Sequence, residues 1–127
     1  MTAVRGIRGA TTADSDTREA ILEATEELLR EMCVVNDVDP EDFASVFFTT
    51  TRDITAEFPQ VAARVGLGWE NVALVGATEM NIANDAERCI RVLIHVNTDK
   101  RQDEMKFVYK RGAIQLRARG RTHTDES

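Results

Sequence analysis

One amphipathic segment, residues 16–35, constrains the fold more than any other feature of the sequence. Asp16 followed by Glu19 has the form of a capping box, so we expect Asp16 to cap a helix N-terminus. Asn36 and Asp37 interrupt the pattern and end the helix. The segment predicts a helix of about five turns with one face on a core. Apolar residues recur at spacings of three and four: Ile21, Ala24, Leu28, Met32 and Val35.

The other periodic segments are short and are typical of strands. The clearest runs from Cys89 to Asn97, where apolar residues at even positions alternate with Arg91, Leu93 and His95. A single helix covers only part of a five-stranded sheet, so we expect another copy of the chain to bury the rest. The further strands expected are residues 4–12, 44–51, 72–75 and 113–117, with short helical turns at residues 39–42, 59–64 and 103–109.

The length and charge of the chain narrow the classes of protein it can belong to. Its 127 residues fit one domain, which we place at residues 1–117, followed by a polar tail at 118–127 that we expect to be mobile. Sixteen Lys and Arg against 22 Asp and Glu give a net charge of -6. This acidic balance argues against a nucleic-acid partner. The sequence has no signal-peptide pattern and no apolar run long enough to span a membrane, so we expect no membrane association.

Cysteine and histidine are too sparse to indicate a metal site. Cys33 and Cys89 do not form a CxxC pair, and the two histidines, His95 and His123, are far apart. We therefore expect reduced thiols, a cytoplasmic protein and no bound metal or cofactor. The sequence also has no GxSxG, P-loop, GxGxxG or HExxH motif, so any catalysis need not involve a nucleophile or a metal.

Arginines within predicted strands are the residues that suggest a binding site. Arg8, Arg91 and Arg117 lie in strands, and Arg64 lies in a short helical segment. Planar guanidinium groups bind carboxylates through paired hydrogen bonds, which lysine does not reproduce. The pattern is consistent with a carboxylate-binding pocket. Taken alone, the spacing of these arginines favours salt bridges to the abundant Asp and Glu over such a pocket.

Several motifs, taken in order, resemble the small monofunctional chorismate mutases of the trimeric, pseudo-α/β-barrel class. The resemblance runs from Val4 to Arg117, with the tail outside it. It is strongest at residues 4–12, where the sequence reads RGIRGATT after Val4, and at Cys89–Val92, which reads CIRV. The other matching motifs are Phe58-Pro59 with Arg64, Gly68-Trp69, Glu79-Met80, Val108-Tyr109 and Leu116-Arg117.

The resemblance implies an α+β fold, an assembly and an activity. The fold would be a five-stranded mixed sheet packed on one long helix, with three chains around a common axis in a homotrimeric pseudo-α/β-barrel. The activity would be the intramolecular Claisen rearrangement of chorismate to prephenate, in the biosynthesis of phenylalanine and tyrosine. That reaction is pericyclic and needs no cofactor, which agrees with the missing nucleophile and metal motifs. The active sites would lie in clefts between the chains.

The resemblance also assigns roles around the breaking bond. Arg8, Arg91 and Tyr109 would hold the enolpyruvyl carboxylate of chorismate. Arg91 would in addition face the ether oxygen, where negative charge develops. Glu79 would accept the hydrogen bond of the ring hydroxyl.

The remaining implied roles concern the outer part of the site. Arg64 and Arg117 would lie near the ring carboxylate, and Phe58, Leu74 and Leu116 would form an apolar wall. The sequence departs from the family at two positions. Gly76 stands where the family can carry a cysteine near the substrate hydroxyl, so that only its backbone is left for contact. Val61 replaces a lysine near the mouth of the site.

Two other functions remain compatible with the same features. An imine or enamine deaminase-like trimer would also use an arginine for a substrate carboxylate in an interfacial cleft. A non-catalytic trimer that binds small carboxylates is the other alternative. The presence of Glu79 together with Arg91 favours the mutase over both.

Overall fold

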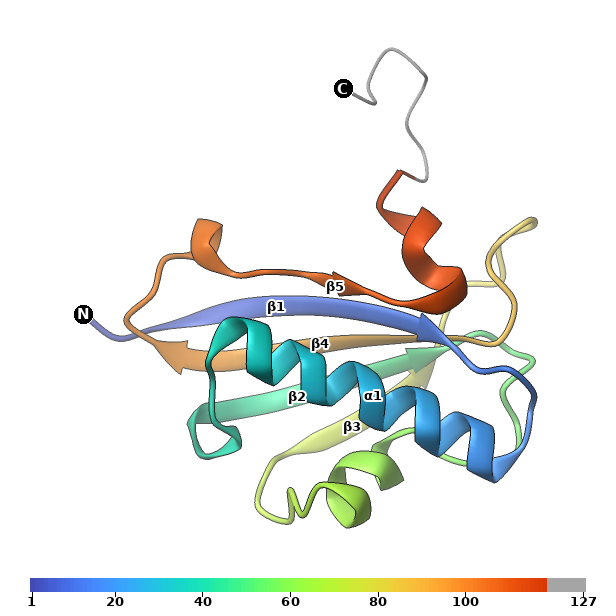
Figure 1. The fold of residues 1–127 in the computed structure, drawn as a ribbon, viewed down its shortest axis with the longest axis horizontal. Helices are drawn as coiled ribbons and strands as arrows, with labels where there is room; N and C mark the ends of the chain where they lie inside the picture. The colour runs from blue at the N-terminus through green and yellow to red at the C-terminus, as the bar shows by residue number, and fades with distance from the viewer. Residues whose placement is uncertain (119–127) are drawn as a thin grey trace.

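The computed structural model describes residues 1–118, with the backbone alone for residues 117 and 118. Five strands form one mixed sheet in the order β3-β2-β4-β1-β5, and a single long helix, α1, lies across one of its faces (Figure 1). Strand β4 is antiparallel to β1 and β2, whereas β5 is parallel to β1 and β3 is parallel to β2. The predicted α+β fold with a five-stranded mixed sheet and one long helix is confirmed. The elements are β1 Ala3–Thr12, α1 Arg18–Asn36, β2 Phe43–Thr50, β3 Leu74–Thr78, β4 Cys89–Thr98 and β5 Val108–Tyr109, with short helical segments at Pro40–Asp42, Ala62–Gly66, Gln102–Glu104 and Arg111–Ala118.

The N-terminal cap of α1 is one residue later than the sequence predicts. Thr17 is the cap, and its hydroxyl accepts a hydrogen bond from the Ala20 amide at 3.2 Å. Asp16 instead accepts hydrogen bonds from the hydroxyl and amide of Thr55 and from the amide of Ala56. These bonds lower the pKa of Asp16, and the bond from the Thr55 hydroxyl contributes most. Asp16 thus fastens the start of the helix to the loop that follows β2.

The core lies between α1 and one face of the sheet. Alternation along the strands turns Ile7, Phe48 and Ile94 toward the helix, where each is at most 1% exposed. Gly9 allows β1 to lie close to α1, because a Cβ at this position would come within 2.5 Å of the Met32 sulfur. The predicted helix face is buried except for Val35, which is 37% exposed.

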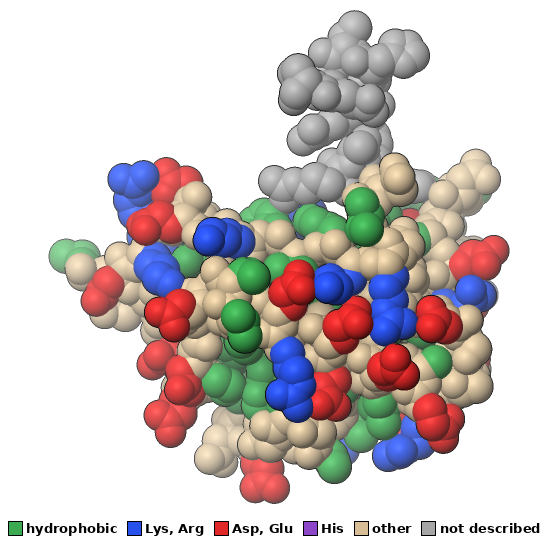
Figure 2. Space-filling model, in the orientation of Figure 1, with side chains coloured by type: hydrophobic (Ala, Val, Ile, Leu, Met, Phe, Trp, Pro, Cys, Tyr) green, Lys and Arg blue, Asp and Glu red, His purple; other side chains and the backbone are tan. Residues whose placement is uncertain are grey.

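The opposite face of the sheet carries apolar side chains in contact with solvent. Val4, Phe47 and Val75 on this face are 55%, 45% and 50% exposed. By contrast, acidic and basic side chains alternate on the side of the molecule that carries α1 (Figure 2). The uncovered sheet face is therefore unlike an ordinary solvated surface, as expected for a face that another chain buries.

The fifth strand is Val108–Tyr109, not residues 113–117 as the sequence suggests. The amide of Lys110 bonds to the Ala10 carbonyl at 2.9 Å, and the chain then leaves the sheet at Arg111, which has a positive φ of 51°. The following residues form the helical segment Arg111–Ala118, in which Ile114 is 60% exposed. The alternating pattern of Ile114 and Leu116 misled the prediction because neither residue has a strand partner there. The helical turn expected at 103–109 is limited to Gln102–Glu104.

Asn36 joins the end of α1 to the segment that leads into β5. It is 3% exposed, and its amide group donates to the carbonyls of Met32 and Lys106 at 2.8 and 2.9 Å. Its side-chain oxygen accepts from the Lys106 amide at 2.7 Å. The residue that interrupts the helical pattern in the sequence is therefore a buried connection that helps to place β5.

Replacing Asn36 with alanine is expected to destabilise the fold by about 2–3 kcal/mol, because buried backbone groups would lose their partners. Chemical denaturation of the Asn36→Ala variant measures this loss. Asn97→Ala is the matched control, since the exposed Asn97 makes one side-chain hydrogen bond of 3.3 Å, to the Asp42 carbonyl. Equal stabilities of the two variants would contradict the assigned role of Asn36.

Candidate active site

Strand pairing places two of the candidate site residues, Arg91 and Tyr109, on either side of Ala10. In the register, Ala10 of β1 faces Arg91 of β4 on one side and Tyr109 of β5 on the other. Arg8 lies two residues earlier in β1 and so projects from the same sheet face. The methyl side chain of Ala10 leaves room above it, and Leu116 approaches from the helical segment Arg111–Ala118.

These residues line a cavity of about 140 Å³, together with Gly9 and Val92. The Arg8 guanidinium donates to the Tyr109 hydroxyl at 3.2 Å and lies 5.4 Å from the centre of the Phe107 ring. We call this cavity the arginine pocket. Its two guanidinium groups and its phenol are all hydrogen-bond donors suited to a carboxylate.

Arg91 is held within the sheet by acidic neighbours. Its Nη2 donates to both carboxylate oxygens of Asp85, at 3.1 and 3.2 Å. Its Nη1 lies 3.9 Å from Oε2 of Glu79. Nη1 is buried and has no hydrogen-bond partner among residues 1–118. A buried N–H group without a partner is costly, so a ligand that accepts a hydrogen bond here would gain affinity.

Glu79 follows directly after β3 and is held on the same side of the sheet. Its carboxylate accepts from the Thr49 hydroxyl at 3.0 Å and from the amide of Met80 at 3.2 Å. The carboxylate is 32% exposed, so it retains room for another donor. Glu79 and Arg91, which the resemblance assigns to one site, therefore lie close together in the structure.

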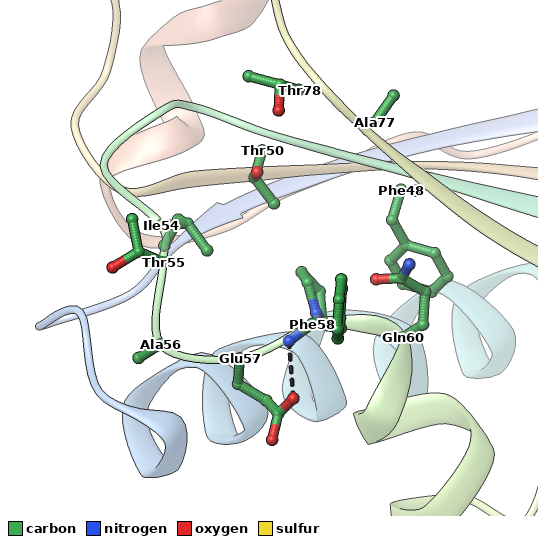
Figure 3. Close-up of a pocket in the computed structure, with 12 residues that line it drawn as sticks. Phe48, Thr50, Ile54, Thr55, Ala56, Glu57, Phe58, Gln60, Ala77 and Thr78 are labelled. Carbon is green, nitrogen blue, oxygen red and sulfur yellow. Dashed lines mark hydrogen bonds between the residues drawn. The ribbon is translucent and has the colours of Figure 1, made fainter.

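Phe58 and Gly76 lie in a different cavity, of about 360 Å³. It is formed by the loop at residues 54–60 and by the ends of β2 and β3, whose side chains Phe48, Thr50, Ala77 and Thr78 appear in Figure 3. Phe58 is 71% exposed at this cavity. A Cβ at Gly76 would come within 2.5 Å of the side-chain nitrogen of Gln60, so Gln60 occupies the space beside the glycine. We call this cavity the loop pocket.

The two pockets are on opposite faces of the sheet. Gly76 aligns with Phe48, whose side chain points toward α1, whereas Arg8, Arg91 and Tyr109 project from the uncovered face. One chain therefore does not place Phe58 next to Arg91.

Arg64 and Leu74 lie outside both pockets. Arg64 is exposed on the helical segment Ala62–Gly66, close in sequence to the loop pocket. Leu74 is partly buried and packs against the core, which argues against a role as wall of either pocket in this chain. The backbone of Arg117 lies in the helical segment Arg111–Ala118, and its side chain is outside the described part.

Comparison with known proteins gives a consistent result over almost the whole chain. The sequence model for chorismate mutase type I matches residues 4–119. The chorismate mutase AroH of Thermus thermophilus is 47% identical over 115 residues, which is 90% of this chain and 93% of that protein. The chain belongs to the chorismate mutase type I family. The AroH protein of Bacillus subtilis strain 168 is 40% identical over 114 residues, or 90% of both chains.

A solved structure supports the same assignment. A chorismate mutase from Clostridium thermocellum superimposes with a TM-score of 0.82 at 44% identity, covering 85% of this chain and 96% of that one. Within residues 1–118, no helix is both long and apolar enough to span a membrane. The same residues include no cluster of three His, Cys, Asp or Glu side chains placed to bind a metal.

Three residues at or beside the pockets of this chorismate mutase were not expected from its sequence. Ala10 separates Arg91 from Tyr109, Asp85 contacts Arg91, and Gln60 lies over Gly76. The small side chain of Ala10 within the strand at residues 4–12 was the one available signal. Asp85 lies in a loop and Gln60 at the start of a short helical turn, where periodicity gives no information about the direction of a side chain.

Burial suppresses the ionisation of both cysteine thiols of the enzyme. Burial raises the pKa of both Cys33 and Cys89 to about 11. Cys89 is completely buried in β4, and neither thiol lines the arginine pocket or the loop pocket. The thiolate, which is the reactive form, is therefore scarce at neutral pH.

We expect activity to survive prolonged treatment with iodoacetamide at pH 8, where about one thiol in a thousand is ionised. The labelling rate should rise with pH toward 11, since the raised pKa delays ionisation. Mass spectrometry of labelled protein, alongside activity, measures both effects. Unfolded protein, which should label rapidly at both cysteines, is the control. Rapid labelling of the folded enzyme with loss of activity would contradict the prediction.

Proposed function

We propose that this enzyme converts chorismate to prephenate in clefts between the chains of a homotrimer, with no bound cofactor. In each cleft one chain contributes the arginine pocket and a neighbouring chain contributes the loop pocket. The observation that carries the proposal is the buried Nη1 of Arg91, which lacks a hydrogen-bond partner among the described residues. It would donate to the ether oxygen of the substrate.

The proposed catalysis combines conformational restraint with electrostatic stabilisation. Chorismate must fold its enolpyruvyl side chain over the ring, and Arg8, Arg91 and Tyr109 hold the side-chain carboxylate in that geometry. Binding in this way removes the ordering cost from the barrier. As the C–O bond stretches, negative charge grows on the ether oxygen, and the fixed guanidinium of Arg91 stabilises it more than it stabilises the ground state.

The other roles complete the contact with the substrate. Glu79 accepts the hydrogen bond of the ring hydroxyl, and Arg64 and Arg117 attract the ring carboxylate at the open side. Phe58 and Leu116 provide apolar contact, and the Gly76 backbone lines the same part of the cleft. A wall role for Leu74 is the least supported, because this side chain packs against the core.

The positions of the two pockets support a site shared between chains. They lie on opposite faces of one sheet, so a neighbour must supply the loop pocket if both contact one substrate. The exposed apolar face with Val4, Phe47 and Val75 provides an interface for this assembly. Contact between two different surfaces of identical chains forms a ring, such as a trimer, where the rotation from one chain to the next closes.

The proposal also includes a single catalytic domain and a cytoplasmic location. Residues 1–117 act as a single catalytic domain, with residues 118–127 as a tail. The free thiols Cys33 and Cys89 are consistent with the reducing environment of the cytoplasm.

Arg91→Ala is expected to lower kcat by about 10³ or more, because a donor aimed at a developing oxyanion is lost. Arg91→Lys should recover part of the activity, since lysine keeps the charge but lacks the planar fork. Loss of chorismate absorbance in the ultraviolet, without metal or nucleotide, measures the rate. A raised KM with kcat within about tenfold of wild type would reduce Arg91 to a binding role.

Mixing two impaired variants tests the shared site. Arg91→Ala and Arg64→Ala chains, co-assembled and assayed well below KM, should regain activity above that of either variant. Random assembly leaves both arginines intact in about a quarter of the clefts when they come from different chains. Arg91→Ala mixed with Arg8→Ala is the control, because both changes fall in the same pocket. A mixture no more active than the mean of its components would argue for sites within single chains.

A further inference from the structure

Asp85 is a largely buried acidic residue that contacts Arg91 of the arginine pocket, and the proposed reaction gives it no role. It lies in the loop between β3 and β4, and its side chain is 11% exposed. Its Oδ1 accepts from the amide of Ala86 at 2.8 Å, which fixes the carboxylate relative to the loop backbone. The same carboxylate accepts from Nη2 of Arg91 through both oxygens. A carboxylate held this way is a rigid anchor rather than a solvated loop charge.

The contact leaves the two terminal nitrogens of Arg91 in different environments. Nη2 is occupied by Asp85, whereas Nη1 is buried without a hydrogen-bond partner in the described part of the chain. Because the guanidinium is planar, fixing Nη2 also fixes the direction of the Nη1 hydrogens.

Glu79 is the group that would capture Arg91 if this anchor were absent. Its Oε2 lies 3.9 Å from Nη1, beyond hydrogen-bond distance, and accepts instead from the Thr49 hydroxyl. A small rotation of a free guanidinium would allow a direct Arg91–Glu79 pair. Such a pair would occupy both the donor meant for the ether oxygen and the acceptor meant for the ring hydroxyl.

We infer that Asp85 is a positioning residue for the reaction: it holds Arg91 by Nη2, directs Nη1 at the substrate and keeps Arg91 apart from Glu79. The inference rests on the proposed catalytic role of Arg91. Asp85 itself does not contact the substrate, so it acts on the rate through the orientation of Arg91.

A competing role for the same contact is inhibition. Asp85 would then occupy Arg91 in place of a substrate carboxylate, and its removal would improve binding. The geometry favours positioning, because Asp85 engages the nitrogen opposite to the one left without a partner. The two roles predict opposite changes in KM and kcat.

Steady-state kinetics of Asp85→Ala and Asp85→Asn distinguish these roles. Asp85→Ala should lower kcat by about tenfold or more with little change in KM, because misorienting a reacting group is costly. Asp85→Asn should retain most of kcat, since the carboxamide oxygen still accepts from Nη2. Glu87→Ala is the matched control: this loop carboxylate is 79% exposed and pairs with Arg88, not Arg91. If Asp85→Ala does not fold, Asp85→Ser takes its place.

A double variant tests whether Asp85 acts through Arg91. In the Arg91→Ala background, Asp85→Ala should cause no further loss of kcat, because the group it positions is gone. A further loss there, a fall in KM at unchanged kcat, or an Asp85→Ala phenotype equal to that of Glu87→Ala would each overturn the inference. Wild-type turnover and the loss in Arg91→Ala test the proposed function separately, and both can hold while the Asp85 inference fails.

Discussion

The charge of Arg91 in the middle of a sheet is the constraint around which the site is organised. A guanidinium in β4 is tolerated because Asp85 and Glu79 approach it from the loop after β3, and because Ala10 leaves space beside it. These carboxylates lower the cost of burying the charge without saturating its hydrogen bonds. The register of the strands therefore determines which hydrogen-bond donors surround Arg91.

The two faces of the sheet have different roles: the covered face forms the core, and the uncovered face carries the arginine pocket. Helix α1 buries Ile7, Phe48 and Ile94 and gives the chain a core of its own. The other face combines the arginine pocket with exposed Val4 and Phe47, so in the proposed trimer it serves both as a binding surface and as an interface. A monomer would leave this apolar area in water and the substrate half-enclosed. Assembly and catalysis are thus linked by one surface in the proposed trimer.

Periodicity predicted the fold where side chains alternate regularly against a core. The strand from Cys89 and the long helix were recognisable because each packs one face against the other. Periodicity gave a wrong prediction for residues 113–117. Just before them the Gly112 amide donates to the Thr12 hydroxyl, and the chain leaves the sheet as a helical segment. The resemblance assigns Arg8, Arg91 and Tyr109 to one site, and in the structure all three line one cavity. The position of Asp85 depends on a loop path that no pattern in the sequence encodes.

The acidic net charge of the chain is compatible with a dianionic substrate because charges act locally. Many carboxylates lie at the surface on the side that carries α1 (Figure 2), where solvent screens them over about 8–10 Å. Beside the arginine pocket, Asp85 and Glu79 contact Arg91, so that two carboxylates balance the formal charges of Arg8 and Arg91. The donors Arg8, Arg91 and Tyr109 still line the cavity. Binding a dianion there depends on oriented N–H groups more than on net charge. A preorganised donor set of this kind suits a pericyclic reaction, in which no proton has to be transferred and the charge to be stabilised exists only in the transition state.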